Sequence, residues 1–228
     1  MDTGVDDDQD VEGLEPGEII LDTPDPPDDL PYADFEDYRA RALLEVNAIL
    51  LTEDALVRTL DHPESVLRGA AAHALGSLGS TAAIPALERL ASAASDLVRV
   101  EAAYALVRLG RDEYRAVLEE ALNYPINAYL SPAVAAGDLA RLSDPAGFPV
   151  IARCLEEHNL IVKIIGCKQL FFFVPFHGTR TRAGQRVDVY ALFDRALHDP
   201  EREVQRVARL QLREVSTEEA RRLLDAST

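Results

Sequence analysis

Apolar residues recur with the spacing of amphipathic helices along most of the chain. Over residues 40–51 they return every three or four positions, so they share one stripe of a helix in which Asn47 is the only polar member. Thr52 is followed by two acids, a pattern typical of a helix start because acids favour the positive N-terminal end. We therefore expect a helix near residues 33–51 that caps one end of the molecule, and a further helix that ends before Pro63.

A nine-residue helical motif then repeats. The segments Ala71–Gly79 (AAHALGSLG) and Ala102–Gly110 (AAYALVRLG) share six of nine positions at an offset of 31 residues. Three less exact copies follow, and most copies are accompanied by a second apolar segment. Each unit is therefore predicted to be two short helices and a turn. The anchor leucines of the five copies are Leu75, Leu106, Leu139, Leu170 and Leu212.

Proline and glycine mark the ends of these predicted helices. Pro85 and Pro149 suit a first helical turn, where a missing N–H has no cost. Gly79 and Gly110 suit the left-handed residue that stops a helix. The sequence therefore predicts both the number of helices in the repeats and the residues at which these helices begin and end.

A single helical hairpin of this length cannot bury its apolar stripe, whereas stacked hairpins can. The many alanines allow close helix approach, and the leucines fill the space between helices. We therefore expect an all-α fold, a right-handed α-solenoid of about five helical hairpins over residues 33–228. A second capping helix is expected to start at Thr217, which is followed by two acids.

The pattern V/L-R-x-x-A-x-x-A-L-x-x-L-G, with an acid a few residues before it, resembles the short HEAT-like repeat, the kind named after phycobilisome lyases. The resemblance covers about residues 53–215 and implies a solenoid that serves as a binding scaffold. The first copy consists of Asp61, Leu67, Arg68, Ala71, Ala74, Leu75, Leu78 and Gly79, and the second of Asp96, Val98, Arg99, Ala102, Ala105, Leu106, Leu109 and Gly110.

Later copies depart from this pattern. The arginine of the motif is replaced by Pro132, Lys163 and Gln205 in the third, fourth and fifth copies. In the family that arginine often pairs with an acid of a neighbouring repeat. The resemblance therefore implies a ladder of ion pairs that weakens beyond residue 130.

The acidity of the chain is concentrated at its N-terminus. The formal net charge is −17, but residues 1–38 hold 15 acids and no Lys or Arg, so the rest of the chain has a net charge of only −2. A body without a positive field disfavours nucleic acid as a partner. Residues 1–32 also contain five prolines and are predicted to form a disordered acidic tail. The apolar triplet 19–21 is either incidental or a short motif that docks onto a partner or onto the body.

Compartment and membrane contact follow from two further features. Cys154 and Cys167 are too few for a disulfide scaffold and are expected to be inert core residues. The chain begins with acids rather than a secretory signal, and its most apolar stretch, 160–176, is interrupted by lysines. A cytoplasmic location without membrane contact is therefore predicted.

The first candidate site is a row on the second helix of each repeat, on the side not used for the core. At 100° per residue, Val100, Tyr104 and Val107 share this side, and the same register selects residues in the neighbouring copies. The row either packs against flanking helices or forms a groove for a partner helix or peptide. Its candidate contact residues are His73, Val100, Tyr104, Val107, Lys168 and Phe171.

The second candidate site is the insertion 175–188 between the fourth and fifth copies. This loop is either a solvated insertion, or a contact for an anion or acidic partner, or a receptor for the chain's own acidic tail. The cluster 171–173 is read either as core or as an interface anchor. The basic residues of the loop are His177, Arg180, Arg182 and Arg186.

Enzyme chemistry has little support in the sequence. The histidines do not have metal-ligand spacing, and no nucleophile elbow, phosphate loop or dinucleotide fingerprint occurs. No enzyme activity, metal or cofactor is expected. The leading hypothesis is a protein–protein scaffold or adaptor that binds another protein through the concave face and the basic loop. The alternatives are a lyase-like or chaperone role on a tetrapyrrole-bearing protein, implied only by the resemblance, and an acidic decoy for a nucleic-acid-binding partner.

Overall fold

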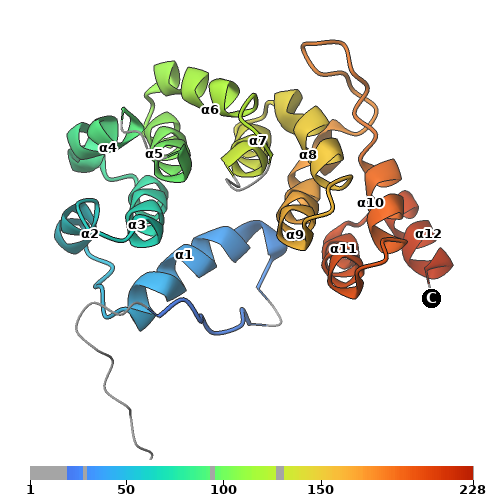
Figure 1. Ribbon diagram of the computed structural model, residues 1–228, viewed down its shortest axis with the longest axis horizontal. Coiled ribbons are helices and arrows are strands. Elements are labelled where there is room, and N and C mark those ends of the chain that lie inside the picture. The colour runs from blue at the N-terminus through green and yellow to red at the C-terminus, as the bar shows by residue number, and fades with distance from the viewer. Residues whose placement is uncertain (1–19, 28–29, 93–95, 127–130, 228) are drawn as a thin grey trace, which may run out of the picture.

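The computed structural model describes residues 20–27, 30–92, 96–126 and 131–227. Over this part of the chain the fold is an all-α solenoid, in which successive hairpins follow a curved path (Figure 1). The outer helices of the curve are α2 (Glu53–Thr59), α4 (Ile84–Ala91), α6 (Arg115–Ala121), α8 (Phe148–Cys154) and α10 (Val189–Leu197). The inner helices are α3 (Ser65–Leu78), α5 (Asp96–Arg108), α7 (Ser131–Arg141), α9 (Leu160–Gln169) and α11 (Arg202–Glu214).

Short 3-10 helices and two further α-helices complete the array. Helix α12 (Glu218–Ala226) follows α11 at the C-terminal end, and α1 (Phe35–Val46) precedes the hairpins. Residues 177–188 form a hairpin loop closed by a single antiparallel bridge between Arg180 and Arg186. The 3-10 segments are η1 (Tyr32–Asp34), η2 (Thr81–Ala83), η3 (Asp112–Tyr114), η4 (Pro145–Gly147) and η5 (Leu170–Phe176).

The predicted helix ends are confirmed at the residues that were expected to form them. Gly79 and Gly110 follow α3 and α5 with φ of 70° and 85°, the left-handed conformation that glycine adopts without strain. Pro85 and Pro149 lie in the first turns of α4 and α8. The Thr217 hydroxyl accepts a hydrogen bond from the Ala220 amide at 3.2 Å, so it caps α12.

The anchor leucines form the centre of the array. Each of the five is at most 1% exposed. They belong to three buried clusters rather than one: the first centres on α3 and α5, the second joins α5 to α6 and α7, and the third extends from α7 to α12. The core is therefore divided along the solenoid axis, as expected for a fold in which each repeat contacts only its neighbours.

Two glycines show how closely the elements approach. A Cβ atom added at Gly76 would lie 2.8 Å from the Cα of Ala105, on the neighbouring inner helix. One added at Gly147 would lie 2.4 Å from the Cα of Ala136. Both contacts are with backbone atoms, which cannot move aside, so the small residues set the spacing of the hairpins.

The ion pairs that the resemblance implies for the repeat arginines are present in one of the first two copies. Arg99 forms an ion pair with Glu120 at 2.7 Å, whereas Arg68 donates to backbone carbonyls, including that of His62 at 2.6 Å. Lys163 forms a mostly buried ion pair with Asp199 at 2.8 Å, in the next repeat. The expected weakening beyond residue 130 therefore does not apply to the fourth copy, where lysine retains the pairing.

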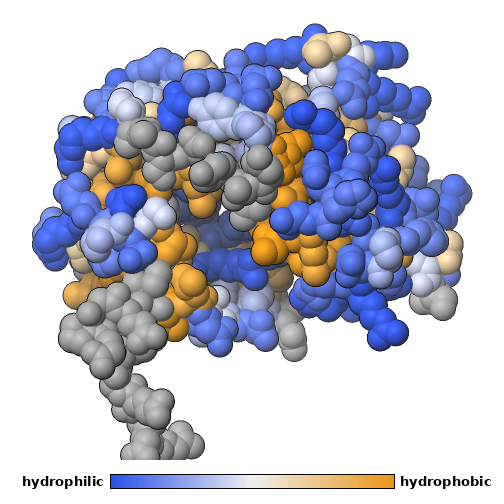
Figure 2. Space-filling model, in the orientation of Figure 1, coloured by the Kyte–Doolittle hydropathy of each residue, from blue (hydrophilic) through white to orange (hydrophobic). Residues whose placement is uncertain are grey.

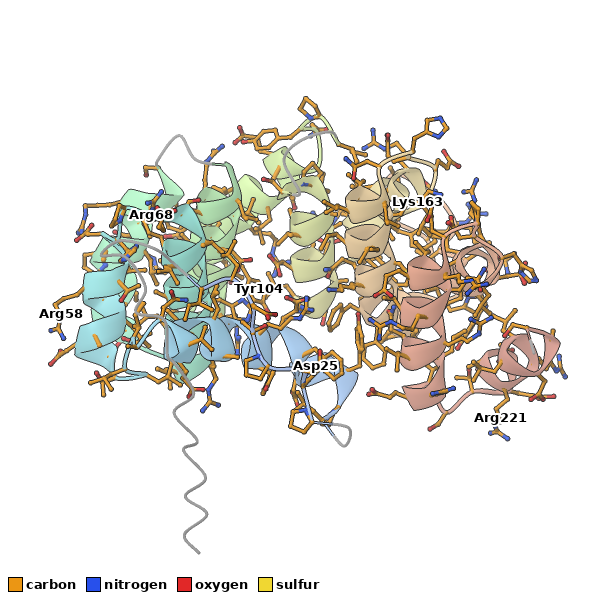
Figure 3. The ribbon with its side chains drawn as sticks, turned by 60° about the horizontal axis from the view of Figure 1, so that its bottom comes forward. Asp25, Arg58, Arg68, Tyr104, Lys163 and Arg221 are labelled. Carbon is orange, nitrogen blue, oxygen red and sulfur yellow. The ribbon has the colours of Figure 1, made fainter. Side chains whose placement is uncertain are left out.

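Helix α1 lies elsewhere than predicted. It does not stack on one end of the array but runs across the concave side, packed on α3 and directed with its N-terminal end toward α9 (Figures 1 and 3). It also ends at Val46, five residues before the predicted boundary. The physical reason for its position is that Asp37 in its first turn pairs with a cation on α3, as described below.

The N-terminal segment before α1 is only partly described. Residues 1–19, which hold most of the predicted acidic tail and the proposed decoy, lie outside the described residues, as does Ile19 of the apolar triplet. Ile20 exchanges two hydrogen bonds with the Asn47 side chain, each at 2.8 Å, so the polar member of the α1 stripe binds this segment. The Leu21 side chain is 64% exposed and does not dock.

No helix among the described residues combines the length and the apolar character needed to cross a lipid bilayer.

The glycine contacts predict a pair of stability changes within one helix. Gly76→Ala should lower the free energy of unfolding by about 1–3 kcal/mol, because the added methyl group meets the backbone of α5. Gly69→Ala, also in α3, should be neutral or stabilising by up to about 1 kcal/mol, because its Cβ would lie at 3.7 Å from the Glu101 side chain. Urea denaturation followed by far-UV circular dichroism measures both, and equal effects would contradict the packing assigned to Gly76.

Candidate functional site

His73 joins three helices on the concave side. Its Nε2 lies 2.6 Å from Oδ1 of Asp37 on α1, and its Nδ1 lies 3.1 Å from Oε2 of Glu101 on α5. The Asp37 carboxylate also accepts a hydrogen bond from Ser77 at 3.1 Å and lies 3.8 Å from the Arg108 guanidinium. An imidazole between two carboxylates is therefore the main polar link between α1 and the solenoid.

The pKa values in this cluster follow from its geometry. Burial alone would lower the pKa of His73, but the hydrogen bonds to Asp37 and Glu101 outweigh burial and raise it to about 10. The hydrogen bond to His73 lowers the pKa of Asp37 to about 2. At neutral pH the pair is an imidazolium and a carboxylate, and His73 keeps its charge because Glu101 faces it from the solenoid side.

Tyr104, on α5, lies beside His73. The two ring centroids are 5.7 Å apart, and the guanidinium groups of Arg108 and Arg141 lie 5.7 Å and 5.9 Å from the Tyr104 centroid. Burial raises the pKa of Tyr104 to about 12, so its phenol stays neutral. Both guanidinium groups lie over the Tyr104 ring, and such cation–π contacts stabilise their positive charge.

A second ion pair continues the polar cluster onto α7. Arg141 lies 2.9 Å from Oδ1 of Asp138, which is 1% exposed. Burial, supported by the nearby Glu101 carboxylate, raises the pKa of Asp138, and the Arg141 guanidinium opposes this shift. Among the described residues, Oδ2 of Asp138, Nη2 of Arg141 and the side-chain oxygen of Gln169 are buried without a hydrogen-bond partner. The concave side therefore contains buried polar atoms whose hydrogen-bonding capacity is not fully used.

Tyr32 anchors the other end of the segment that contains α1. Its amide donates to Oε2 of Glu214 at 2.6 Å, and its hydroxyl donates to the Lys168 carbonyl at 3.0 Å. The ring packs against Phe171 with centroids 5.3 Å apart. The chain is thus fixed to α3 through Asp37 and to the last repeats through Tyr32.

The predicted row is only partly concave. Val100 is 1% exposed and belongs to the core cluster that links α5 to α6 and α7, and Val107 is also buried. Lys168 lines a hollow of about 350 Å³ together with Tyr32 and α11, and burial lowers the pKa of its ammonium group. The structure therefore brings His73 and Tyr104 together, places Lys168 and Phe171 beside the Tyr32 anchor, and leaves the two valines in the core.

Figure 2 shows the side of the arc seen in Figure 1, with hydrophobic patches toward its middle and a mostly hydrophilic outer rim. Of the predicted aromatic cluster, Phe173 is fully buried in the core, whereas Phe172 is partly buried with the Arg141 guanidinium 4.0 Å from its ring centroid. The core interpretation therefore holds for Phe173, and the role of an interface anchor stays a prediction for the partly buried phenylalanines.

The basic loop lies apart from the concave face, because its hairpin projects away from α1 (Figure 1). His177 lies 3.8 Å from Asp188 and packs on Tyr190 at the base of the hairpin. Arg180 donates to the Gly184 carbonyl at 2.6 Å, and Arg186 is exposed. The concave row and the hairpin are therefore two separate surfaces.

Sequence reasoning missed the acids and arginines that complete the concave cluster. Asp37 was grouped with the acidic tail, and Glu101, Asp138 and Arg141 were not singled out. A usable signal was present, because Asp138 and Arg141 interrupt an otherwise small and apolar inner helix.

Two further groups are chemically quiet. Cys154 and Cys167 are buried free thiols, and burial raises the pKa of each to about 12, far from thiolate reactivity. Among the described residues no group of three or more His, Cys, Asp or Glu side chains could hold a metal ion.

The His73 cluster predicts how tightly α1 is held at each pH. The pKa of His73 is raised from 6.5 to about 10, so its contribution is complete below pH 6.5 and is lost as pH rises toward 10. The pKa of Asp37 is lowered from 3.8 to about 2, so its contribution is complete above pH 3.8 and is lost as pH falls toward 2. Hydrogen exchange of the α1 amides, corrected for intrinsic rates, should show strongest protection between these limits.

His73→Gln should remove the loss of protection at high pH, whereas His158→Gln, an exposed histidine, should leave the profile unchanged. A His73→Gln chain whose α1 protection still declines between pH 6.5 and 10 would contradict the assignment.

Comparisons with known proteins concern the repeats. Residues 52–135 match the family model described as HEAT repeats. No curated protein matches the chain. Among solved structures, the chain is similar to a crystal structure of an engineered protein, a target of the Northeast Structural Genomics Consortium, with 16% identity and a TM-score of 0.40 over 80% of this chain and 86% of that one. Residues 52–135 are therefore similar to HEAT repeats, and they cover the hairpins from α2 into α7.

Proposed function

We propose that the chain is a protein-interaction scaffold whose concave face binds an α-helical segment of a partner protein. HEAT repeats generally serve as such scaffolds, and residues 52–135 match them. The observation that carries the proposal is that one helix, α1, already lies against the concave face and is held through His73. A surface that accepts an intramolecular helix has the shape and charge to accept an equivalent helix from another protein.

The attachment of α1 to the solenoid is suited to its replacement by a helix of another protein. Only Ala42 and Leu44 of its twelve residues are buried, whereas α3 buries nine of fourteen. The segment that follows α1 contains Ala48 with φ of 56°, a left-handed conformation that costs alanine about 1 kcal/mol or more. A helix with little buried apolar surface and a strained connection belongs to the less stable parts of a fold.

Charge indicates what kind of helix would replace α1. When α1 leaves, Glu101 still contacts His73, and Arg108 and Arg141 add positive charge on the same face. The site then lacks one carboxylate, that of Asp37. The expected partner helix therefore carries an aspartate or glutamate in the register of Asp37, with small apolar residues on the same side.

The proposal is tested with a labelled peptide of residues 30–47 added to the full chain. Asp37→Lys in the chain places a cation beside His73 and should release its α1. The peptide, which retains Asp37, should then bind at least about tenfold more tightly to this variant than to the unaltered chain, since one charge-assisted contact is worth about 1.4 kcal/mol or more. Fluorescence anisotropy measures the two dissociation constants.

Asp34→Lys is the matched control, because Asp34 is an exposed acid in η1, three residues from Asp37. It should bind the peptide no better than the unaltered chain. Equal peptide affinities for the Asp37→Lys and Asp34→Lys chains would show that the concave face does not exchange helices, and the proposal would fail.

A further inference from the structure

A polar hollow of about 400 Å³ lies at the side of the hairpin, away from the concave face. It forms where three elements distant in sequence meet: the start of α6, the turn between α7 and η4, and the hairpin itself. Its lining residues are Arg115, Leu142, Ser143, Asp144, Pro145, Arg180 and Arg182.

Arg182 is held in place by two carboxylates. Its guanidinium lies 2.7 Å from Oδ2 of Asp144 and 3.1 Å from Oε1 of Glu119. Asp144 is 4% exposed and is itself fixed, because its Oδ1 accepts a hydrogen bond from the Ala146 amide at 3.0 Å. The hairpin is thereby fastened to the α7–α8 turn, and its arginines keep a defined position over the hollow.

The remaining arginines are not neutralised. In the part of the chain that the structure describes, Arg115, Arg180 and Arg186 form no ion pair, and the Arg180 side chain is oriented by its hydrogen bond to the Gly184 carbonyl. Arg186 faces Arg180 across the bridge of the hairpin. Two arginines of the lining, Arg115 and Arg180, therefore carry positive charge that no ion pair balances, in a chain whose net charge is −17.

Ser143 supplies a second, independent observation. It follows α7 with φ of 64°, at the repeat position that Gly79 and Gly110 occupy after α3 and α5. A non-glycine residue in this conformation costs of order 1 kcal/mol, and such strain clusters at functional positions. Here the serine adds a hydroxyl group to the lining of the hollow, which glycine could not do.

We propose that this hollow binds a phosphate group. Arg115 and Arg180 supply guanidinium donors that no ion pair engages, the Arg182–Asp144 pair fixes the hairpin beside them, and the Ser143 hydroxyl donates to a further oxygen. A phosphate carries nearly two negative charges and three or more acceptor oxygens, which matches two unbalanced charges and donors from separate elements better than a single carboxylate does. The site is independent of helix exchange on the concave face.

The test is calorimetric titration of the full chain at low ionic strength with three probes: inorganic phosphate, a phosphoserine peptide, and the same peptide with glutamate instead. Phosphate or the phosphoserine peptide should bind, and the stronger of the two identifies whether the group comes free or on a side chain. The double variant Arg115→Gln/Arg180→Gln should weaken this binding at least about tenfold. Arg58→Gln, an exposed arginine at the far end of the array (Figure 3), should leave it unchanged.

Ser143→Gly separates binding from folding. It should raise the melting temperature because it removes the strain, and it should weaken phosphate binding about two- to fivefold because it removes a donor. The proposal is overturned if neither phosphate probe binds, if the glutamate peptide binds as tightly as the phosphoserine peptide, or if the double variant binds like Arg58→Gln.

Discussion

Every hairpin of this chain leaves one apolar side uncovered, and only contact with the next hairpin removes that side from water. The contact is close because Gly76, Gly147 and the alanines opposite them have almost no side chain to separate the backbones. Shape, curvature and the existence of a concave side all follow from this constraint. A bulkier residue at these points would change the spacing between neighbouring hairpins and thereby the position of every functional side chain further along.

The concave side combines the small residues needed for packing with a charged cluster that packing alone does not require. His73, Glu101 and Arg141 come from three successive inner helices, α3, α5 and α7. Asp37 of α1 adds a second carboxylate to His73 and lies 3.8 Å from the Arg108 guanidinium. The solenoid and α1 are thus electrostatically complementary, although α1 contributes little to the apolar core.

The repeat architecture was predictable because it depends on local and periodic signals. Leucine and alanine spacing gave the hairpins, and glycine, proline and threonine gave their ends, since each acts through the conformation of its own few residues. The position of α1 was not predictable in this way. Whether an amphipathic helix stacks on an end or crosses the concave side depends on one long-range ion pair, between residues 36 positions apart, and no periodicity encodes it. For the candidate row the sequence left both packing and a groove open, and Val100 and Val107 prove to be buried.

The anchor at Tyr32 extends the influence of α1 beyond the surface that it covers. The segment from Tyr32 to Val46 is bound at one end to α11 and α9, and toward its other end Leu44 packs in the cluster formed with α3, so it forms a chord across the arc of hairpins (Figure 1). Small rotations between neighbouring hairpins change the curvature of the arc. A segment that is attached at two distant points of the arc limits this bending. Detachment of the chord therefore changes the mechanical compliance of the entire arc, including the distance between its first and last repeats.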